Sequence, residues 1–184
     1  MHIAIDIGHA RGTGAVGLSG ENEHEIAARV APLLQHYLLT PTPAGVGVAR
    51  QVDIIDYPDA SNGVDLARTI AAVNEGGYDL LLSLHCDSSE NPAACGAHAC
   101  YYSIEGGRLA SCVGYSLAGL MPGRAEKTVH RPGLAILRDT KPVAVLVEMG
   151  FVSNLTDSHI QQSYPAMIAE RIAMGVKNYL HLRK

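Results

Sequence analysis

The sequence is poor in basic residues and has no basic cluster. It carries 14 lysines and arginines against 18 aspartates and glutamates in 184 residues, which gives a formal net charge of -4. A protein that binds nucleic acid needs a concentrated positive surface to neutralise phosphates. The composition therefore argues against nucleic acid as a partner.

Long apolar runs are also missing. No run approaches the roughly 20 residues that an α-helix needs to cross a bilayer. The amino terminus enters a short apolar stretch at once, without the basic segment, the longer apolar core and the small-residue cleavage site of an export signal. We expect neither a membrane span nor a signal peptide in this sequence.

Paired cysteine motifs are absent as well. The sequence has four cysteines, at positions 86, 95, 100 and 112, and none of them forms a C-x-x-C pair. A chain of this length does not need a disulfide framework, so we expect reduced thiols. Low-complexity tracts and internal repeats are missing, and 47% of the residues are hydrophobic. Length and composition together predict one domain over residues 1–184.

Apolar runs and helical periodicities alternate along the chain. The predicted strands are residues 3–8, 46–50, 80–84, 97–102, 134–137 and 143–147. The predicted helices are residues 23–39, 64–75, 108–120 and the tail from 156, in which Pro165 should start a second piece. Pro32 should kink or divide the first helix. This alternation predicts an α/β layer architecture with about six strands, with residues 122–133 as a surface loop.

Three polar side chains follow or end the most apolar of these strands. His9 follows the run at 3–8, His85 follows the run at 80–84, and Glu148 follows the run at 143–147. Continuous apolar runs are typical of parallel strands buried on both faces, and ligands bind beyond the carboxyl ends of such strands. We therefore expect these three side chains to lie at one edge of the sheet.

Two histidines and one carboxylate would meet the ligand count of a catalytic zinc, which keeps a fourth position open. Three glutamates at the start of the first helix could supply the carboxylate, namely Glu21, Glu23 and Glu25. Their spacing does not choose among them, and carboxylates also suit the positive end of a helix. From residue types alone, structural histidines explain the pattern as well as a metal site does.

Five segments resemble, in order, the zinc-dependent N-acetylmuramoyl-L-alanine amidases that cut bacterial cell wall. They are IDIGH at 5–9, EHE at 23–25, LAR at 66–68 with Asn74, LSLHCD at 82–87 and VLVEMGFVSN at 145–154. Each motif is short, but together they cover nearly the whole chain. The resemblance departs at the first ligand, where the family's Pro-Gly-His-Gly reads IGHA at 7–10, and in a shorter following loop that lacks the usual aspartate.

The resemblance implies a single three-layer α/β/α domain with a mostly parallel central sheet. It implies that His9, Glu23 and His85 bind Zn²⁺ and that Glu148 is the catalytic carboxylate. The substrate would be peptidoglycan, cut between N-acetylmuramic acid and L-alanine, at the bacterial cell wall outside the cytoplasm or in the periplasm. Such a role fits either a phage endolysin or a bacterial autolysin.

Of three other functions, one is excluded and two remain alternatives. A serine hydrolase is excluded because the glycines around Ser116 have the wrong spacing for a nucleophile elbow. A zinc peptidase or deacylase acting on another amide is an alternative, because ligands define the chemistry better than they define the substrate. A catalytically silent wall-binding module is another, although Glu148 and all three ligands argue against it.

A few further residues near these motifs have two interpretations. Asp6 or Asp87 could accept a hydrogen bond from a ligand imidazole, or could be an ordinary strand-end or turn residue. His130 and Arg131 could touch substrate, but solvation of a loop explains them more simply. Cys86 should point away from His85 and pack as a buried thiol.

Overall fold

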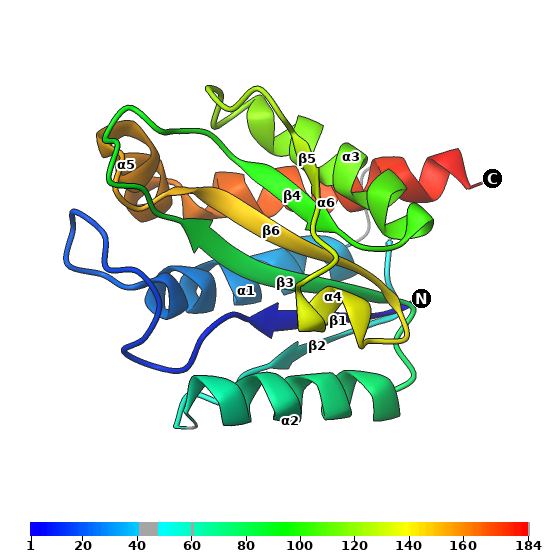
Figure 1. Ribbon diagram of the computed structural model, residues 1–184. Helices are drawn as coiled ribbons and strands as arrows, with labels where there is room; N and C mark the ends of the chain where they lie inside the picture. The colour runs from blue at the N-terminus through cyan, green and yellow to red at the C-terminus, as the bar shows by residue number, and fades with distance from the viewer. Residues whose placement is uncertain (41–47, 60, 184) are drawn as a thin grey trace.

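The computed structural model describes residues 1–40, 48–59 and 61–183, in which helices cover both faces of a six-stranded sheet (Figure 1). The strands are β1 (His2–Ile7), β2 (Gln51–Ile55), β3 (Leu80–Asp87), β4 (His98–Tyr101), β5 (Thr128–His130) and β6 (Val143–Phe151). The helices are α1 (Glu23–Leu39), α2 (Asn62–Glu75), α3 (Ile104–Ala118), α4 (Ala135–Arg138), α5 (Leu155–Ser163) and α6 (Pro165–Leu182). The predicted α/β architecture is confirmed.

The strand order is β2-β1-β3-β6-β4-β5. The first four strands of this order run parallel, whereas β4 runs antiparallel to β6 and β5 runs parallel to β4. The sheet is therefore mostly parallel, as predicted. The carboxyl ends of β1, β3 and β6 lie at one edge, and α1 starts beside them (Figure 1).

Two apolar clusters fill the space between the sheet and its helices. The larger joins one face of β1, β3 and β6 to α1, α3 and α6, with residues such as Ile5, Leu82 and Val147 at its centre. The smaller lies on the opposite face, where Leu81 and Leu146 meet Ile136 of α4 and Val73 of α2. Helices thus cover both faces of one sheet, which is the three-layer α/β/α arrangement (Figure 1).

Two strand predictions are wrong. Residues 134–137, expected as a strand, form the turn before α4 and most of that helix. An apolar run this short has no usable period, so it cannot be told from a buried helical turn. The strand expected at 46–50 is displaced along the chain, because β2 starts at Gln51. Residues 48–50 are not part of a strand, and residues 46–47 lie outside the described ranges.

Several helix boundaries differ from those predicted from the sequence. Pro32 does not divide α1, which runs from Glu23 to Leu39. Pro32 is exposed, so the carbonyl that loses its helical partner lies on the solvent side of the helix. The segment expected as loop at 122–133 contains the short strand β5, and α3 begins four residues before the predicted start at 108. The break at Pro165 is confirmed as the start of α6.

None of the helices in the described ranges combines the length and the hydropathy required to cross a bilayer.

Candidate metal centre

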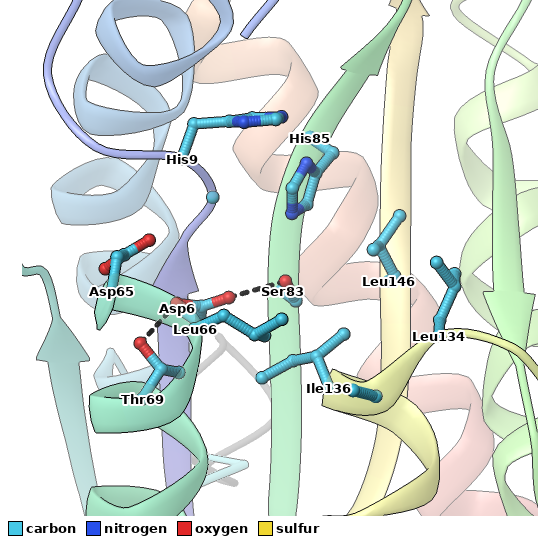
Figure 2. A pocket seen from close by; sticks show the side chains of 12 residues that line it. Asp6, His9, Asp65, Leu66, Thr69, Ser83, His85, Leu134, Ile136 and Leu146 are labelled. Atoms are coloured by element: carbon cyan, nitrogen blue, oxygen red, sulfur yellow. Dashed lines mark hydrogen bonds between the residues drawn. The ribbon is translucent and has the colours of Figure 1, made fainter. Parts of the chain in front are cut away.

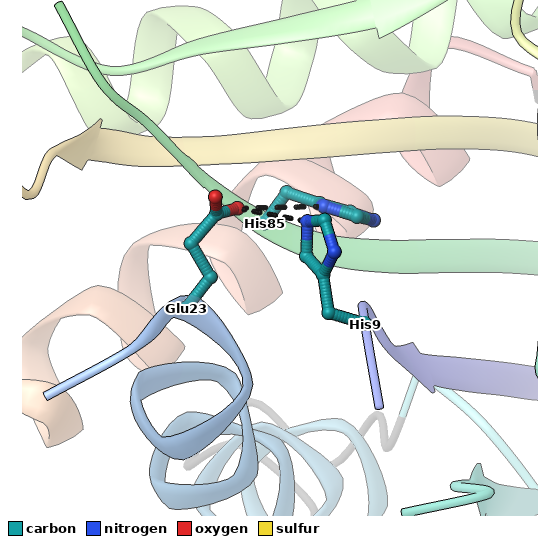
Figure 3. Close-up of side chains that lie close together, drawn as sticks. All are labelled: His9, Glu23 and His85. Atoms are coloured by element: carbon teal, nitrogen blue, oxygen red, sulfur yellow. Dashed lines mark ion pairs between the residues drawn. The ribbon is translucent and has the colours of Figure 1, made fainter. Parts of the chain in front are cut away.

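His9, Glu23 and His85 come together at the carboxyl edge of the sheet (Figure 3). One candidate ligand atom from each residue lies within 4.8 Å of the others, and within the described ranges no further group of three or more histidine, cysteine or acidic residues meets this test. Oε2 of Glu23 lies 3.2 Å from Nε2 of His9 and 3.7 Å from Nδ1 of His85. Three segments far apart in sequence therefore direct their polar atoms to one point.

The backbone around His9 is shaped to allow this approach. His9 has a φ of 64°, a left-handed conformation that residues other than glycine rarely adopt. The preceding Gly8 donates its N–H to the carbonyl of Leu84, which brings the chain against β3. A Cβ at Gly8 would lie 2.3 Å from Nε2 of His85, so only glycine leaves room for that ring. Strain of this kind persists where the surrounding structure fixes it, commonly at functional sites.

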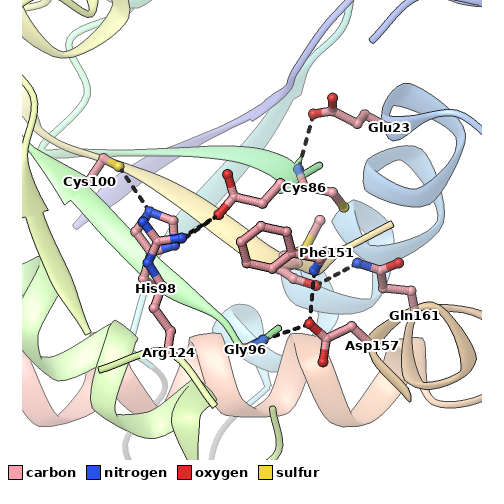
Figure 4. Close-up of polar contacts among 11 residues, drawn as sticks. Glu23, Cys86, Gly96, His98, Cys100, Arg124, Phe151, Asp157 and Gln161 are labelled. Carbon is pink, nitrogen blue, oxygen red and sulfur yellow. Dashed lines mark hydrogen bonds and ion pairs between the residues drawn. The ribbon is translucent and has the colours of Figure 1, made fainter. Parts of the chain in front are cut away.

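Glu23 is held at the first turn of α1 by its neighbours. Asn22 caps the helix, accepting from the N–H of Glu25 while the Glu25 side chain accepts from the N–H of Asn22. Oε1 of Glu23 accepts from the N–H of Ala15 at 2.8 Å, and Oε2 accepts from the N–H of Cys86 at 3.2 Å (Figure 4). The carboxylate is therefore fixed in position by backbone donors on both sides.

Charge at this point favours an ionised carboxylate. Burial opposes the ionised form of Glu23, but hydrogen bonds with His85 and His9 and from the amide of Ala15 lower its pKa well below the ordinary range. The hydrogen bond with Glu23 raises the pKa of His9 against the opposing effect of burial. Two imidazoles and an anionic carboxylate form a donor set that suits a divalent transition metal.

The structure also distinguishes the three glutamates. Glu21 forms an ion pair with Arg29, and the Glu25 side chain completes the helix cap. Only Glu23 lies with the two histidines. Backbone geometry thus separates residues that their spacing in the sequence could not.

Glu148 lies beside this group in the sheet. On β6 it is the register partner of His85 on β3, so the two side chains share one face. Its Oε2 is buried and has no hydrogen-bond partner among the described residues. Burial, followed by the charges of Asp87 and Glu23, raises the pKa of Glu148 to about 8, although Arg124 and Arg131 act in the opposite direction. A carboxyl group of this kind holds a proton near neutral pH.

A second polar group, unexpected from the sequence, lies on the other side of Glu148. His98 on β4 is the register partner of Glu148, and its Nδ1 lies 3.3 Å from Oδ2 of Asp87. Arg124 donates to the same oxygen at 3.0 Å (Figure 4). Burial and the nearby arginines lower the pKa of His98 to about 3, so its ring is neutral. Arg124 belongs to a stretch that reads as an ordinary surface loop, and nothing in the sequence pairs it with Asp87.

The end of β6 after Glu148 is fixed by a buried carboxylate. Oδ2 of Asp157 accepts from the N–H groups of Phe151 and Gly96, at 2.9 and 2.7 Å (Figure 4). Gln161 donates to the carbonyl of Met149 at 2.9 Å. These contacts from α5 hold the strand that carries Glu148.

The remaining candidates lie outside the group of three. Asp6 accepts hydrogen bonds from the hydroxyl groups of Ser83 and Thr69 rather than from a ligand histidine. His130 is not in a loop but ends strand β5, where it is exposed and bonds to the carbonyl of Tyr102. Cys86 is buried in the larger apolar cluster, as expected.

Comparison with known proteins shows which family the chain resembles. A family model described as N-acetylmuramoyl-L-alanine amidase matches residues 3–178. The catalytic domain of the CD27L endolysin, which targets Clostridia difficile, is 30% identical, with a TM-score of 0.83 and 97% of each chain covered. The CwlD amidase from Clostridioides difficile, solved in complex with the GerS lipoprotein, shares the fold with a TM-score of 0.84 at 19% identity, with 98% of each chain covered.

The chain is also similar to a protein of Staphylococcus aureus. The probable cell wall amidase LytH is 30% identical over 105 residues, which is 55% of this chain. The chain spans only 35% of the length of that relative. The family match, in contrast, extends over almost the entire sequence and includes every residue of the candidate site, so the chain belongs to the N-acetylmuramoyl-L-alanine amidase family.

Proposed function

We propose that this chain is a zinc-dependent N-acetylmuramoyl-L-alanine amidase. It would hydrolyse the amide bond between the lactyl carbonyl of N-acetylmuramic acid and the amino group of L-alanine in peptidoglycan. Its place of action would be the bacterial cell wall. The observation that carries the proposal is the convergence of His9, Glu23 and His85 at one point beside Glu148.

His9, Glu23 and His85 would hold the zinc ion. Their residue types match the two-histidine, one-glutamate set of known catalytic zinc sites. When bound, zinc supplies a Lewis acid that polarises a carbonyl and lowers the pKa of water. The backbone donors at Ala15 and Cys86 would hold Glu23 in the orientation that binding needs.

Glu148 would act as general base and then as general acid. As base, its carboxylate takes a proton from the attacking water while the new C–O bond forms. As acid, it returns a proton to the amine nitrogen of L-alanine while the C–N bond breaks. Burial, which raises the pKa of Glu148 to about 8 in the metal-free protein, favours the protonated form that the acid step needs. The carboxylate that the base step needs would be favoured by the positive charge of a bound zinc ion nearby.

Mass spectrometry of the reaction products tests the proposal. Purified peptidoglycan is digested with zinc-loaded protein, with protein stripped by a chelator, and with the Glu148→Gln variant. We expect stem peptides with a free L-alanine amino terminus only from the zinc-loaded wild type. Exposed Glu90 supplies the control, because Glu90→Gln removes a carboxylate outside the site and should digest as the wild type does.

The other outcomes separate the alternatives. Metal-dependent products cut at a different amide would contradict the amidase assignment and favour a peptidase or deacylase. Zinc binding without any product would favour a wall-binding module. Products that survive both chelation and Glu148→Gln would contradict the proposed mechanism.

A further inference from the structure

A cavity of about 240 Å³ opens beside the candidate metal centre, on the face of the sheet covered by α2 and α4 (Figure 2). Two of the three proposed metal ligands, His9 and His85, also line this cavity, so the cavity and the centre are contiguous. Pockets that take drug-sized ligands measure roughly 300–1,000 Å³. This cavity is therefore suited to one side chain or a group of similar size.

Two buried carboxylates lie in the cavity wall. Asp6 is 5% exposed and Asp65 is 6% exposed. Asp6 is held by neutral donors, with Ser83 Oγ at 2.6 Å and Thr69 Oγ1 at 3.4 Å (Figure 2). Oδ1 of Asp65 is buried and receives no hydrogen bond from the described residues. An unpaired buried carboxylate is costly, and proteins normally provide it with a partner.

The described part of the chain supplies no strong positive charge here. No lysine or arginine of the described ranges forms an ion pair with Asp6 or Asp65. Burial, followed by the charges of Asp6 and Asp56, raises the pKa of Asp65 to about 6, so this group is mostly ionised at pH 7.5. The negative charge of Asp65 therefore has no lysine or arginine partner among the described residues, and the basic side chains that line the cavity are the imidazoles of His9 and His85.

The rest of the wall is apolar. Leu66 of α2, Leu134 and Ile136 near α4, and Leu146 of β6 line it. Such walls do not suit a hydrated metal ion, which prefers oxygen ligands on all sides. They suit an alkyl chain, and the carboxylates suit a positive group at its end.

We propose that this cavity is a subsite for a primary ammonium group carried on a short aliphatic chain. In the substrate, this would be a stem-peptide side chain that ends in an amine, so the identity of the natural ligand rests on the proposed function. Asp65 supplies the open acceptor, Asp6 is a second carboxyl group in the same wall, and the four apolar side chains contact the methylene groups. Position next to His9 would let the subsite select the peptide whose amide lies at the metal centre.

The first test uses metal-free protein and small probes, and it does not depend on catalysis. Methyl and amide NMR spectra are recorded during titration with n-butylamine or with n-butanol at pH 7.5. We expect saturable shifts of Leu66 and Ile136 methyl resonances with the amine, and at least tenfold weaker binding of the alcohol. Equal binding of both probes, or no saturable shift with the amine, would overturn the subsite.

Variants sharpen the comparison. Asp65→Asn removes the open charge with little change of shape and should weaken butylamine binding at least tenfold. It should remain folded, because it removes an unpaired buried charge. Asp59→Asn, at an exposed position of the preceding loop, should bind butylamine as the wild type does. Retention of full amine affinity by folded Asp65→Asn would contradict the assignment to Asp65.

The second test asks whether the subsite selects substrate. Stem-peptide substrates are compared with the side-chain amine free or N-acetylated, using kcat/KM of zinc-loaded protein. We expect a preference of at least tenfold for the free amine, reduced in Asp65→Asn but kept in Asp59→Asn. No preference in the wild type would overturn the substrate role. Amine binding without any amide hydrolysis would support the subsite and contradict the proposed function.

Discussion

Glu148 lies in an environment unlike that of an ordinary surface carboxyl group. Its side chain is partly buried, and one of its oxygens is fully buried and lacks a partner among the described residues. The same burial that prepares it to hold a proton must cost stability when it ionises. The burial of Glu148 therefore supports its proposed catalytic role and also lowers the stability of the fold when the side chain ionises.

In metal-free protein, Glu148→Gln should become increasingly stabilising relative to wild type as the pH rises from 5 to 8. The folded pKa is about 8 and the ordinary value is 4.5. Between these values the folded state keeps a proton that the unfolded state has lost, so the free energy of unfolding of the wild type falls with rising pH. The difference should reach the order of a few kcal/mol at pH 8, as measured by urea unfolding in the presence of chelator.

Glu90→Gln provides the matched control for that series. Its free energy of unfolding should follow the wild type at every pH, because Glu90 lies exposed in a loop. A constant difference between Glu148→Gln and wild type across the pH range would show that Glu148 ionises normally. That result would remove the physical basis of its acid/base role.

Gly8→Ala should weaken zinc binding by about 10- to 100-fold, in the range found for groups that orient metal ligands. The new Cβ would overlap the ring of His85 and force it from its place. Zinc affinity is measured by competition with a chromogenic chelator. Gly63→Ala is the control, because a Cβ there meets nothing within 4 Å, and its affinity should not change. Equal affinities of the two variants would contradict the role of Gly8.

At the scale of single residues, the sequence was most informative where motifs could be compared with a family. His9, His85 and Glu148 stand at strand ends, and the resemblance selected Glu23 among three glutamates. The left-handed backbone of His9 and the pairing of Arg124 with Asp87 could not be predicted, because both depend on how separate loops meet. Asp65 likewise reads as a polar residue in the first turn of a helix until packing buries it.

At the scale of elements, the start of α1 links the fold to the site. The cap at Asn22 fixes the first turn, and Glu23 is the first residue of that turn. The direction of α1 and the position of the carboxylate therefore depend on the same few hydrogen bonds. A change to the cap should affect stability and metal binding together.

Asn22→Ala should cost about 1 kcal/mol of stability and lower zinc affinity about tenfold or more. Ser103→Ala removes the corresponding cap of α3, where Ser103 accepts from the N–H of Gly106. Because β4 runs antiparallel to β6, α3 starts at the opposite edge of the sheet from Glu148. The two variants should lose similar free energies of unfolding in urea, but only Asn22→Ala should bind zinc more weakly. Unchanged affinity in Asn22→Ala would separate the cap from the site.

Elements were predictable where their period or length was distinctive. The central strands β1, β3 and β6 are continuous apolar runs because helices cover both of their faces. β2 lies at the edge of the sheet and mixes polar and apolar residues, so its pattern QVDII did not indicate a strand. The run at 134–137 was misread for the opposite reason, since a buried single helical turn can be as apolar as a strand.

At the scale of the whole molecule, the three proposed ligands join three segments that also pack together in the larger apolar cluster. His9 follows β1, Glu23 starts α1 and His85 lies on β3. A ligand that binds only the folded state adds its binding free energy to the stability of the fold, about 2.7 kcal/mol at a free concentration 100 times Kd. Zinc should therefore stabilise the entire chain and not only its loops.

Zinc should raise the midpoint of thermal unfolding of wild-type protein, and a chelator should reverse the shift. His85→Ala should abolish the shift, since it removes one of the three ligands. His181→Ala changes an exposed histidine at the end of α6 and should leave it intact. A shift that persists in His85→Ala would place the responsible ion elsewhere. Differential scanning calorimetry gives the midpoint.

The location of zinc in a crystal is the most direct test of the central claim that His9, Glu23 and His85 form one catalytic metal site. Crystals grown with zinc are measured on both sides of the zinc absorption edge, and an anomalous difference map is calculated. The account predicts one strong peak bonded to all three residues at about 2.0–2.2 Å. No peak at this position, or a peak bound by other residues, would contradict it.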